Sequence, residues 1–129
     1  MKTWLAVALG GALGASCRYA VTLVCIAWCG KSLAPLATLT VNIVGSFLMG
    51  YLYARGLTEE GLSEELRGFL AIGFLGALTT FSAFSLDAMH LLEHEGGLKA
   101  ALYVLASLLG ALLAFAAGNH WTRQLLEGG

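Results

Sequence analysis

Long runs without charged residues dominate the sequence. They occupy residues 4–28, 32–54, 68–86 and 100–122, and Arg18 is the one charged residue within them. A helix needs about 20 apolar residues to cross a hydrocarbon core of roughly 30 Å. The pattern therefore predicts an all-α membrane protein with four transmembrane helices, at about residues 4–29, 33–54, 67–93 and 98–122.

Short polar connections separate the four runs. The first spans residues 31–35, and the third is a tight glycine turn near residues 94–97. The second is a longer connector that carries four glutamates, Glu59, Glu60, Glu64 and Glu65. Links of this length predict a single four-helix transmembrane domain over residues 1–129. An even number of crossings places both termini on one side of the membrane.

Lysine and arginine are divided almost evenly between the two sides. The side with the termini and the second link carries Lys2, Arg55, Arg67 and Arg123, and the other side carries Lys31 and Lys99. Arg18 is unassigned and could make the count four against three. The orientation of a membrane protein follows the excess of these residues in the flanks of its helices. So weak a bias predicts that the chain inserts either way up.

Composition supports the membrane assignment and excludes several other classes. The chain is 58% hydrophobic and 12% charged, whereas soluble domains are about 45–50% apolar and roughly a quarter charged. Its net charge is −1 and it has no basic cluster, which argues against binding to nucleic acid. Cys25 and Cys29 lie one turn apart without a nearby His or acidic residue, so we interpret them as small packing residues.

Small residues in the first run repeat at helical spacing. Ala6, Gly10 and Gly14 recur every four residues, and Gly11 and Ala15 form an adjoining stripe. Helices in lipid pack closely where small residues let their backbones approach. We therefore expect this face to contact another helix, although glycine is also common in membrane helices whatever their packing.

Polar residues form two stripes within the apolar runs. Thr38, Asn42 and Ser46 recur every four residues in the second run, and Tyr103 and Ser107 do so in the fourth. Polar side chains in a membrane usually face the interior of the bundle. They either form hydrogen bonds between helices or line a pathway, and two aligned stripes favour the pathway. Four helices enclose little more than their own side chains, so such a pathway would need a second copy.

The third run has an unusual sequence, GFLGALTTFSAFS, at residues 73–85. Gly73 and Gly76 weaken a helix, and the β-branched residues Thr79 and Thr80 follow. An irregular backbone at this depth is tolerated where protein or water surrounds it, and its freed carbonyls can coordinate a cation. We expect two half-helices that meet at residues 76–79. A continuous helix with glycine packing is the alternative.

Two phenylalanines follow this irregular stretch. Phe81 and Phe84 are three residues apart and share a helix face. The edges of phenyl rings carry partial positive charge. Beside Asn42 they would form an electropositive environment without a fixed charge that traps an anion. A phenylalanine pair at this spacing is also compatible with ordinary packing in a core or against lipid.

Three motifs resemble the Fluc/CrcB family of small bacterial fluoride channels. They are GGALGASCRY at residues 10–19, TLTVNIVGSFLMG at residues 38–50 and GFLGALTTFSAFS at residues 73–85. The motifs lie in order in the first three runs, and chain length and helix number also agree. The resemblance implies an antiparallel, dual-topology homodimer with two fluoride pores and a broken third helix, in the bacterial plasma (inner) membrane.

The resemblance also implies roles for individual residues. The fluoride pores would be lined by Phe81, Phe84, Asn42, Thr38, Tyr103, Ser107 and Ser82. The backbone carbonyls of Gly76 and Thr79, with their symmetry mates, would hold one central structural Na⁺ at the dimer interface. Arg18 would lie near an aqueous vestibule, and Asp87 is the second residue expected in a vestibular or structural role.

Two positions depart from the family pattern. Ala83 stands where many relatives have a threonine, so no hydroxyl role carries over to it, and Asp87 replaces the usual glutamate with a shorter carboxylate. Further on, Ala111 ends the hydroxyl stripe one turn after Ser107. The implied mechanism is passive, because an inside-negative potential drives an anion out with about 2.3 kcal/mol per elementary charge per 100 mV.

Three other classes of protein fit parts of the pattern. A small multidrug exporter couples protons through a carboxylate in its first helix, but the first run here has Arg18 and no acidic residue. An intramembrane hydrolase would need Ser82 or Ser85 to meet Asp87 and His90, and neither a nucleophile elbow nor an oxyanion loop accompanies them. The third class is a non-conducting assembly subunit, and only the two polar stripes argue against it. We expect a channel and not an enzyme.

Overall fold

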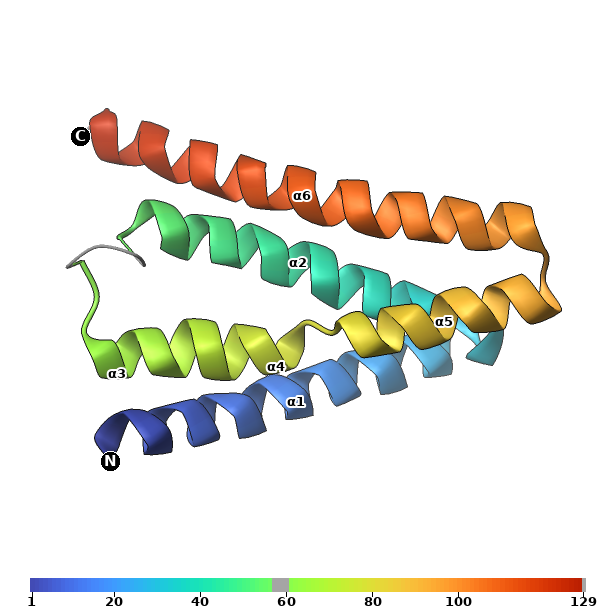
Figure 1. The fold of residues 1–129 in the computed structure, drawn as a ribbon, viewed down its shortest axis with the longest axis horizontal. Coiled ribbons are helices and arrows are strands. Elements are labelled where there is room, and N and C mark those ends of the chain that lie inside the picture. The colour runs from blue at the N-terminus through green and yellow to red at the C-terminus, as the bar shows by residue number, and fades with distance from the viewer. Residues whose placement is uncertain (57–60, 129) are drawn as a thin grey trace.

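The computed structural model describes residues 1–56 and 61–128, and these residues fold almost entirely into helices (Figure 1). The first two crossings are α1 (Lys2–Cys29) and α2 (Pro35–Ala54), joined by the 3₁₀ turn η1 (Lys31–Leu33). The last is α6 (Gly97–Glu127). The described residues hold four helical stretches that are long and apolar enough to span a membrane, and no strand. The predicted fold class is thus confirmed.

The third crossing consists of several helical pieces. It begins with α3 (Glu64–Arg67), continues as the π-helical segment η2 (Gly68–Leu75) and the short α4 (Gly76–Leu78), and resumes after a break as α5 (Phe81–His94). Ser63 caps its start, because the Ser63 hydroxyl accepts a hydrogen bond of 3.2 Å from the Leu66 amide. The predicted interruption of this helix is therefore present.

The ends of the helices differ from the expected ranges by a few residues. α1 already begins at Lys2, and α6 continues to Glu127, five residues past the end of the predicted apolar run. A helix can continue into water beyond the bilayer, because Arg, Gln, Leu and Glu all favour helical backbone. Glu59 and Glu60 of the predicted solvated connector lie outside the described residues.

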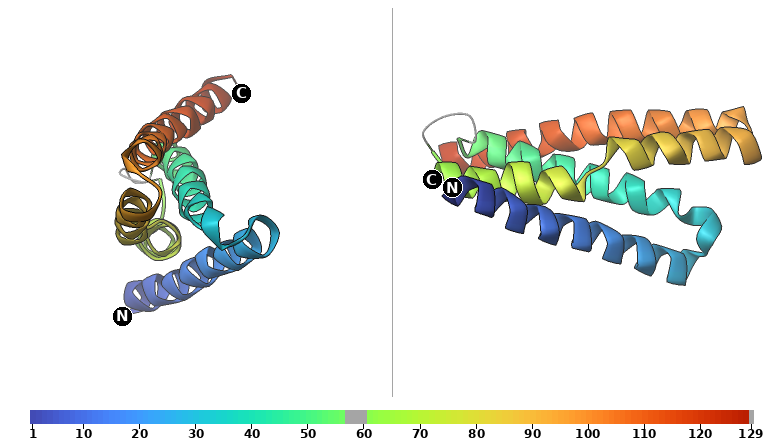
Figure 2. Two further views of the ribbon diagram at one scale, coloured as in Figure 1. Left: turned by 90° about the vertical axis from the view of Figure 1, so that its right-hand side faces the viewer. Right: turned by 60° about the horizontal axis from the view of Figure 1, so that its bottom comes forward.

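Both termini lie at one end of the bundle, as an even number of crossings requires (Figure 1). The α1–α2 and α5–α6 connections lie at the opposite end. α2 packs along α6, and the third crossing contacts both outer helices in turn. Its first half, η2 with α4, packs on α1, whereas α5 packs on α6 (Figure 2). The break thus lies where the third crossing changes its neighbour.

α1 contacts the third crossing through its glycine face. A Cβ atom added at Gly10 would lie 2.2 Å from the Phe69 carbonyl oxygen, and one at Gly14 would lie 2.1 Å from that of Phe74. Both distances are far shorter than any real contact, so only glycine permits this approach. The expected packing is thus confirmed for the stripe with Gly10 and Gly14, whereas nothing lies within 4 Å of the Cβ position of Gly11 in the adjoining stripe.

α2 and α6 meet through a reciprocal pair of glycines. A Cβ atom at Gly50 would lie 2.1 Å from the Phe115 carbonyl oxygen, and one at Gly118 would lie 2.2 Å from that of Phe47. Each helix thus places a glycine directly against the backbone of the other. Without a hydrophobic driving force between helices in lipid, such close packing holds the pair together.

Apolar residues cover much of the outside of the bundle. Large side chains such as Trp4, Trp28, Leu112 and Leu113 are exposed. The interior is small and consists of two clusters, one built on Val41, Leu75 and Leu78, and the other on Phe84, Leu91, Ala100 and Tyr103. An apolar exterior around a small interior is the distribution expected for helices that face lipid.

Candidate functional site

The break in the third crossing comprises Thr79 and Thr80. Both have extended backbones, with φ −81° and ψ 154° at Thr79 and φ −154° and ψ 124° at Thr80. Gly76 is helical, with φ −63° and ψ −32°, so only Thr79 of the expected meeting point at residues 76–79 is extended, and the break continues to Thr80. β-Branched threonine suits an extended backbone, whereas Gly73 serves a close approach to Val7 of α1.

Asn42 of α2 holds the broken backbone through two reciprocal hydrogen bonds. Its Nδ2 donates to the Thr80 carbonyl oxygen at 3.0 Å, and its Oδ1 accepts from the Thr80 amide at 2.7 Å. The side-chain amide thereby pairs with Thr80 as a neighbouring strand would. Because both polar groups of an extended residue need partners in a membrane, this pairing stabilises the break.

Thr80 also starts the second half of the crossing. It is the N-cap of α5, and its hydroxyl oxygen accepts a hydrogen bond of 3.2 Å from the Ala83 amide. Hydroxyl side chains at this position satisfy amides that have no partner within the helix. The Ser82 hydroxyl lies 3.2 Å from that of Thr80 and is exposed. Thr80 is therefore fixed by its backbone to α2 and by its side chain to α5.

Because of these hydrogen bonds, two backbone carbonyl groups lack the amide donors that they would have in a regular α-helix. In an unbroken helix the Thr80 amide would donate to Gly76 and the Ala83 amide to Thr79. Here the Thr80 amide pairs with Asn42, and the Ala83 amide pairs with the Thr80 hydroxyl. The carbonyls of Gly76 and Thr79 are thus left for another partner. A hard cation such as Na⁺ prefers oxygen ligands of this kind.

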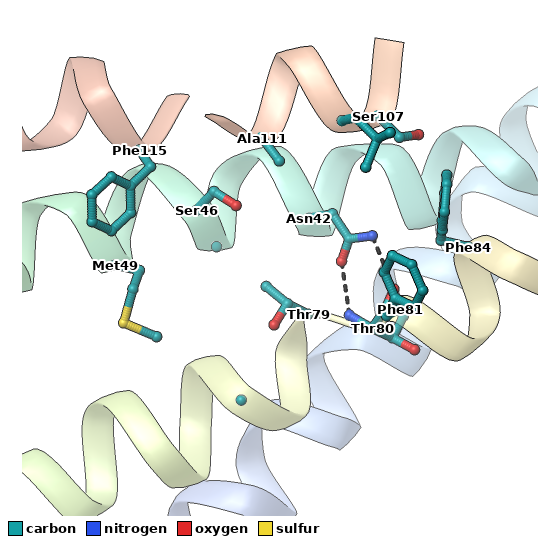
Figure 3. Close-up of a pocket in the computed structure, with 13 residues that line it drawn as sticks. Asn42, Ser46, Met49, Thr79, Thr80, Phe81, Phe84, Ser107, Ala111 and Phe115 are labelled. Carbon is teal, nitrogen blue, oxygen red and sulfur yellow. Dashed lines mark hydrogen bonds between the residues drawn. The ribbon is translucent and has the colours of Figure 1, made fainter. Parts of the chain in front are cut away.

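A cavity of about 410 Å³ opens beside the break (Figure 3). α2 contributes Asn42 and Ser46 to its wall, the third crossing contributes Gly76 and residues 79–81, and α6 contributes Ser107 and Ala111. Several predicted site residues, distant in sequence, therefore share one cavity. They are Asn42, Gly76, Thr79, Phe81, Phe84 and Ser107.

The two phenylalanines at this cavity have very different surroundings. Their ring centroids are 5.2 Å apart and their planes are inclined by 45°. Phe84 is 8% exposed, whereas Phe81 is 73% exposed in the single chain. Aromatic rings at this spacing present both faces and edges to neighbouring groups. Phe81 therefore marks the open side of the cavity, and Phe84 lies within the protein.

Ser107 of α6 brings a hydroxyl group to the same cavity. The side chain is 5% exposed, and its Oγ makes no hydrogen bond of good geometry within the part of the chain that the structure describes. The Tyr103 hydroxyl is a polar neighbour of this Oγ, but it donates to Asp87 instead. Buried polar atoms are almost always satisfied, because leaving one unpaired costs about 1–3 kcal/mol. A hydroxyl without a protein partner beside a cavity is suited to bind something within that cavity.

Tyr103 and Asp87 form a pair next to the phenylalanines. The Tyr103 hydroxyl donates a hydrogen bond of 3.1 Å to Asp87 Oδ2, and its ring stacks on Phe84 at 5.7 Å between centroids. The shorter side chain of Asp87 thus still reaches α6. This contact fixes the orientation of Tyr103 and, through it, of Phe84.

A second cavity, of about 290 Å³, holds Arg18 and Thr38. Tyr19 and Thr22 of α1 line it, together with Thr80 and Ala83. Thr38 therefore lies with Arg18 and not among the residues that line the first cavity. Thr80 borders both cavities, so the Asn42–Thr80 pair lies between them. This arrangement places the arginine of the first crossing close to the break.

Thr80 was not among the predicted site residues. It was recognised only as β-branched, although a threonine directly before an apolar helical segment is a typical N-cap signal.

The serines considered for a hydrolase have other hydrogen-bond partners. The Ser85 hydroxyl donates to the Phe81 carbonyl oxygen at 2.9 Å, and the Ser82 hydroxyl pairs with that of Thr80. His90 stacks on His94 instead of meeting either serine.

Comparison with known proteins gives a consistent family assignment. A family profile described as CrcB-like protein, Camphor Resistance (CrcB), matches residues 5–119. A protein of Saccharophagus degradans is 45% identical over 95% of this chain and 91% of its own length. A protein of Stutzerimonas stutzeri is 53% identical over 88% of this chain and 90% of its own length. A protein of Hahella chejuensis is 42% identical over 93% of this chain and 94% of its own length.

All three relatives bear the name fluoride-specific ion channel FluC. The profile match, over residues 5–119, includes the three motifs that carried the resemblance, the broken crossing and the residues of both cavities. Four membrane-spanning helices and these relatives make the chain a multi-pass membrane protein. The profile covers most of the chain, and the chain therefore belongs to the CrcB-like family.

Proposed function

We propose that this protein is a fluoride-selective ion channel of the bacterial inner membrane that exports cytoplasmic fluoride passively. The observation that carries the proposal is the cavity at the break, which gathers Phe81, Phe84 and an unpartnered Ser107 hydroxyl around Asn42. The relatives' names give the ion and the class of protein, which is a channel and not an enzyme.

The chemistry of the cavity suits a small, strongly hydrated anion. The Ser107 hydroxyl offers a hydrogen-bond donor, and the Asn42 amide keeps one Nδ2 hydrogen besides the one that it donates to Thr80. The phenyl edges add partial positive charge without a fixed charge. Arg18 and Thr38, in the second cavity, would attract the ion towards the break from the other side. Together these groups would replace the water that fluoride loses.

We infer that the channel is an antiparallel homodimer with two pores. Phe81 is largely exposed, and the first cavity is open along the side of the single chain, so a second copy would complete its wall. The balanced Lys and Arg flanks fit dual topology. A label at either terminus should then be accessible from both sides of the membrane in a cell population. Labelling from one side alone would exclude this arrangement.

The carbonyls of Gly76 and Thr79 fit the proposed structural Na⁺. In a regular helix the amides of Thr80 and Ala83 would donate to these two carbonyls, but here they donate to the side chains of Asn42 and Thr80. Both carbonyl oxygens can therefore coordinate a cation. Two such carbonyls from each of two copies would give four oxygen ligands on the axis of a dimer. A bound cation would supply a fixed positive charge between the two pores and would join the two breaks.

The driving force needs no coupling machinery. Fluoride enters cells as neutral HF at acidic external pH and is trapped as the anion in the more neutral cytoplasm. An inside-negative potential then favours its exit by about 2.3 kcal/mol per 100 mV. The residues of the chain would have to dehydrate the ion and guide it, but they would not have to drive it against a gradient. This distinguishes the proposal from a proton-coupled exporter.

Fluoride efflux from liposomes that contain the purified protein tests the proposal. Vesicles loaded with potassium fluoride should release fluoride when valinomycin lets potassium follow, and vesicles loaded with potassium chloride should release little. Release that depends on an imposed proton gradient would support a proton-coupled exporter instead. Absence of fluoride release from correctly folded protein would favour a non-conducting assembly subunit.

A further inference from the structure

The last turn of α5 carries a pair of stacked histidines. His90 and His94 are four residues apart, and their ring centroids lie 4.4 Å from each other with the planes inclined by 21°. Both side chains are exposed. α5 ends at the turn into α6, at the end of the bundle opposite both termini (Figure 1). The pair is therefore accessible and lies apart from the two cavities at the break.

A backbone hydrogen bond orients one of the two rings. His94 Nδ1 lies 3.0 Å from the His90 carbonyl oxygen. A carbonyl oxygen can only accept, so Nδ1 must carry the hydrogen, and Nε2 of the neutral ring is then left with a free lone pair. A histidine that binds a metal commonly donates its other N–H to a carbonyl in this way. The ring of His94 is thus already held as a metal ligand would be.

The charges around the pair favour a cation. Residues 87–99 contain three carboxylates, Asp87, Glu93 and Glu95, and a single ammonium group, that of Lys99. Lys99 and Glu95 form an ion pair and offset each other, which leaves the charges of Asp87 and Glu93. This short stretch therefore has a net negative charge at neutral pH, and a divalent ion would approach it favourably.

We propose that His90 and His94 form a binding site for a divalent transition-metal ion of the class of Zn²⁺, Ni²⁺ or Cu²⁺. Residues at i and i+4 lie on one helix face, and imidazole is a preferred ligand of these ions. Metal–nitrogen bonds of about 2.0–2.1 Å bring two ligating nitrogens to roughly 3 Å from each other. The rings are stacked in the structure, so the His90 ring would turn about its side-chain torsions until one of its nitrogens lies beside Nε2 of His94. The proposal does not depend on the transported ion.

Two imidazoles supply only part of the coordination shell. Among residues 1–56 and 61–128, no group of three or more His, Cys, Asp and Glu side chains converges on one point. Water would therefore fill the remaining positions, as it does at metal sites that are not purely structural. The bound ion would bridge one turn and stabilise the end of α5, whose start carries Phe81.

The chain offers a matched control for this site. It contains three histidines, and His120 is also exposed but lies alone on α6. We would titrate Ni²⁺ and Zn²⁺ into tag-free protein in detergent by calorimetry. One ion per chain is expected, with affinity lowered about tenfold or more in His90→Ala and in His94→Ala. His120→Ala should bind like the unaltered protein.

Several results would overturn the site. Unchanged affinity in His90→Ala or His94→Ala would show that the pair is not the ligand set, and loss of binding in His120→Ala would place the site on α6. Equal binding of Mg²⁺ would indicate the acidic surface instead of the imidazoles, because Mg²⁺ prefers oxygen ligands. Absence of any heat with Ni²⁺ or Zn²⁺ would also refute the proposal.

Discussion

The side chain of Asn42 and the backbone of Thr80 exchange two hydrogen bonds, of 2.7 and 3.0 Å, across 38 residues of sequence. This pairing lets a membrane-spanning helix stop and restart without leaving the amide and carbonyl of Thr80 exposed to an apolar environment. It also lies between the two cavities, and it takes the Thr80 amide that would donate to the Gly76 carbonyl in an unbroken helix. The central part of the candidate site depends on this one contact.

Replacing Asn42 should therefore damage both stability and transport. In Asn42→Ala the Thr80 amide and carbonyl lose their partners, which we expect to lower stability by about 1–3 kcal/mol. Fluoride flux should fall with it. Thr40→Ala is the matched control, since Thr40 is a polar residue of the same helix that does not line the cavity and donates only to its own helix at Leu36. Thermal unfolding in detergent and liposome flux measure the two effects, and equal behaviour of both variants would contradict the assigned role.

The cap at the start of α5 gives a second prediction. Thr80→Val keeps the side-chain shape but removes the hydroxyl that accepts from Ala83, and should cost about 1 kcal/mol. Thr80→Ser should restore most of the loss. Thr40→Val serves as the control, because the Thr40 hydroxyl only donates 2.8 Å to its own helix at Leu36. If Thr40→Val were as harmful as Thr80→Val in thermal unfolding, capping would not be the cause.

The exposed phenylalanine gives a prediction about transport alone. Phe81→Ile removes a phenyl edge from the open side of the cavity and should suppress fluoride flux without affecting assembly. Leu86→Ile is the control, because Leu86 is 70% exposed on the same helix, close to the 73% of Phe81. Flux and oligomeric state would be measured together. Normal flux in Phe81→Ile would remove this residue from the pathway.

The glycine contacts between α2 and α6 predict a strong effect of one methyl group. Gly50→Ala would place a Cβ atom 2.1 Å from the Phe115 carbonyl oxygen, so the helices must separate and folded protein should be largely lost. Gly11→Ala is the control, because nothing lies within 4 Å of its Cβ position. That variant should be neutral or slightly stabilising, by about 0.5–1 kcal/mol. Comparable yields of both variants would refute the packing argument.

The fold was predictable where a property of consecutive residues determined it. Uncharged runs near 20 residues specify membrane helices, and the spacing of Gly10 and Gly14 indicates a packing face. The position of the break was not predictable to the residue, because glycine can either weaken a helix or allow close packing. Gly73 does the latter against Val7, and the extended residues are Thr79 and Thr80.

Tertiary pairing explains what the sequence pattern did not reveal about the site. Asn42 was predicted as a polar residue of the pathway, but its partner lies on another helix and leaves no local signal. The N-cap role of Thr80 had a local signal that the β-branched character of the residue obscured. The π-helical geometry of η2 has no clear sequence pattern. Thr38 and Ser107, expected to line the same pores, border different cavities, and Tyr103 lies near both of them.

The most direct test of the central claim is the reversal potential of the current through the purified protein in a planar bilayer. With fluoride on one side and an equal concentration of chloride on the other, a passive fluoride-selective channel should give a reversal potential far from zero, because fluoride carries nearly all of the current. A current that reverses near zero, or that requires a proton gradient, would contradict the account.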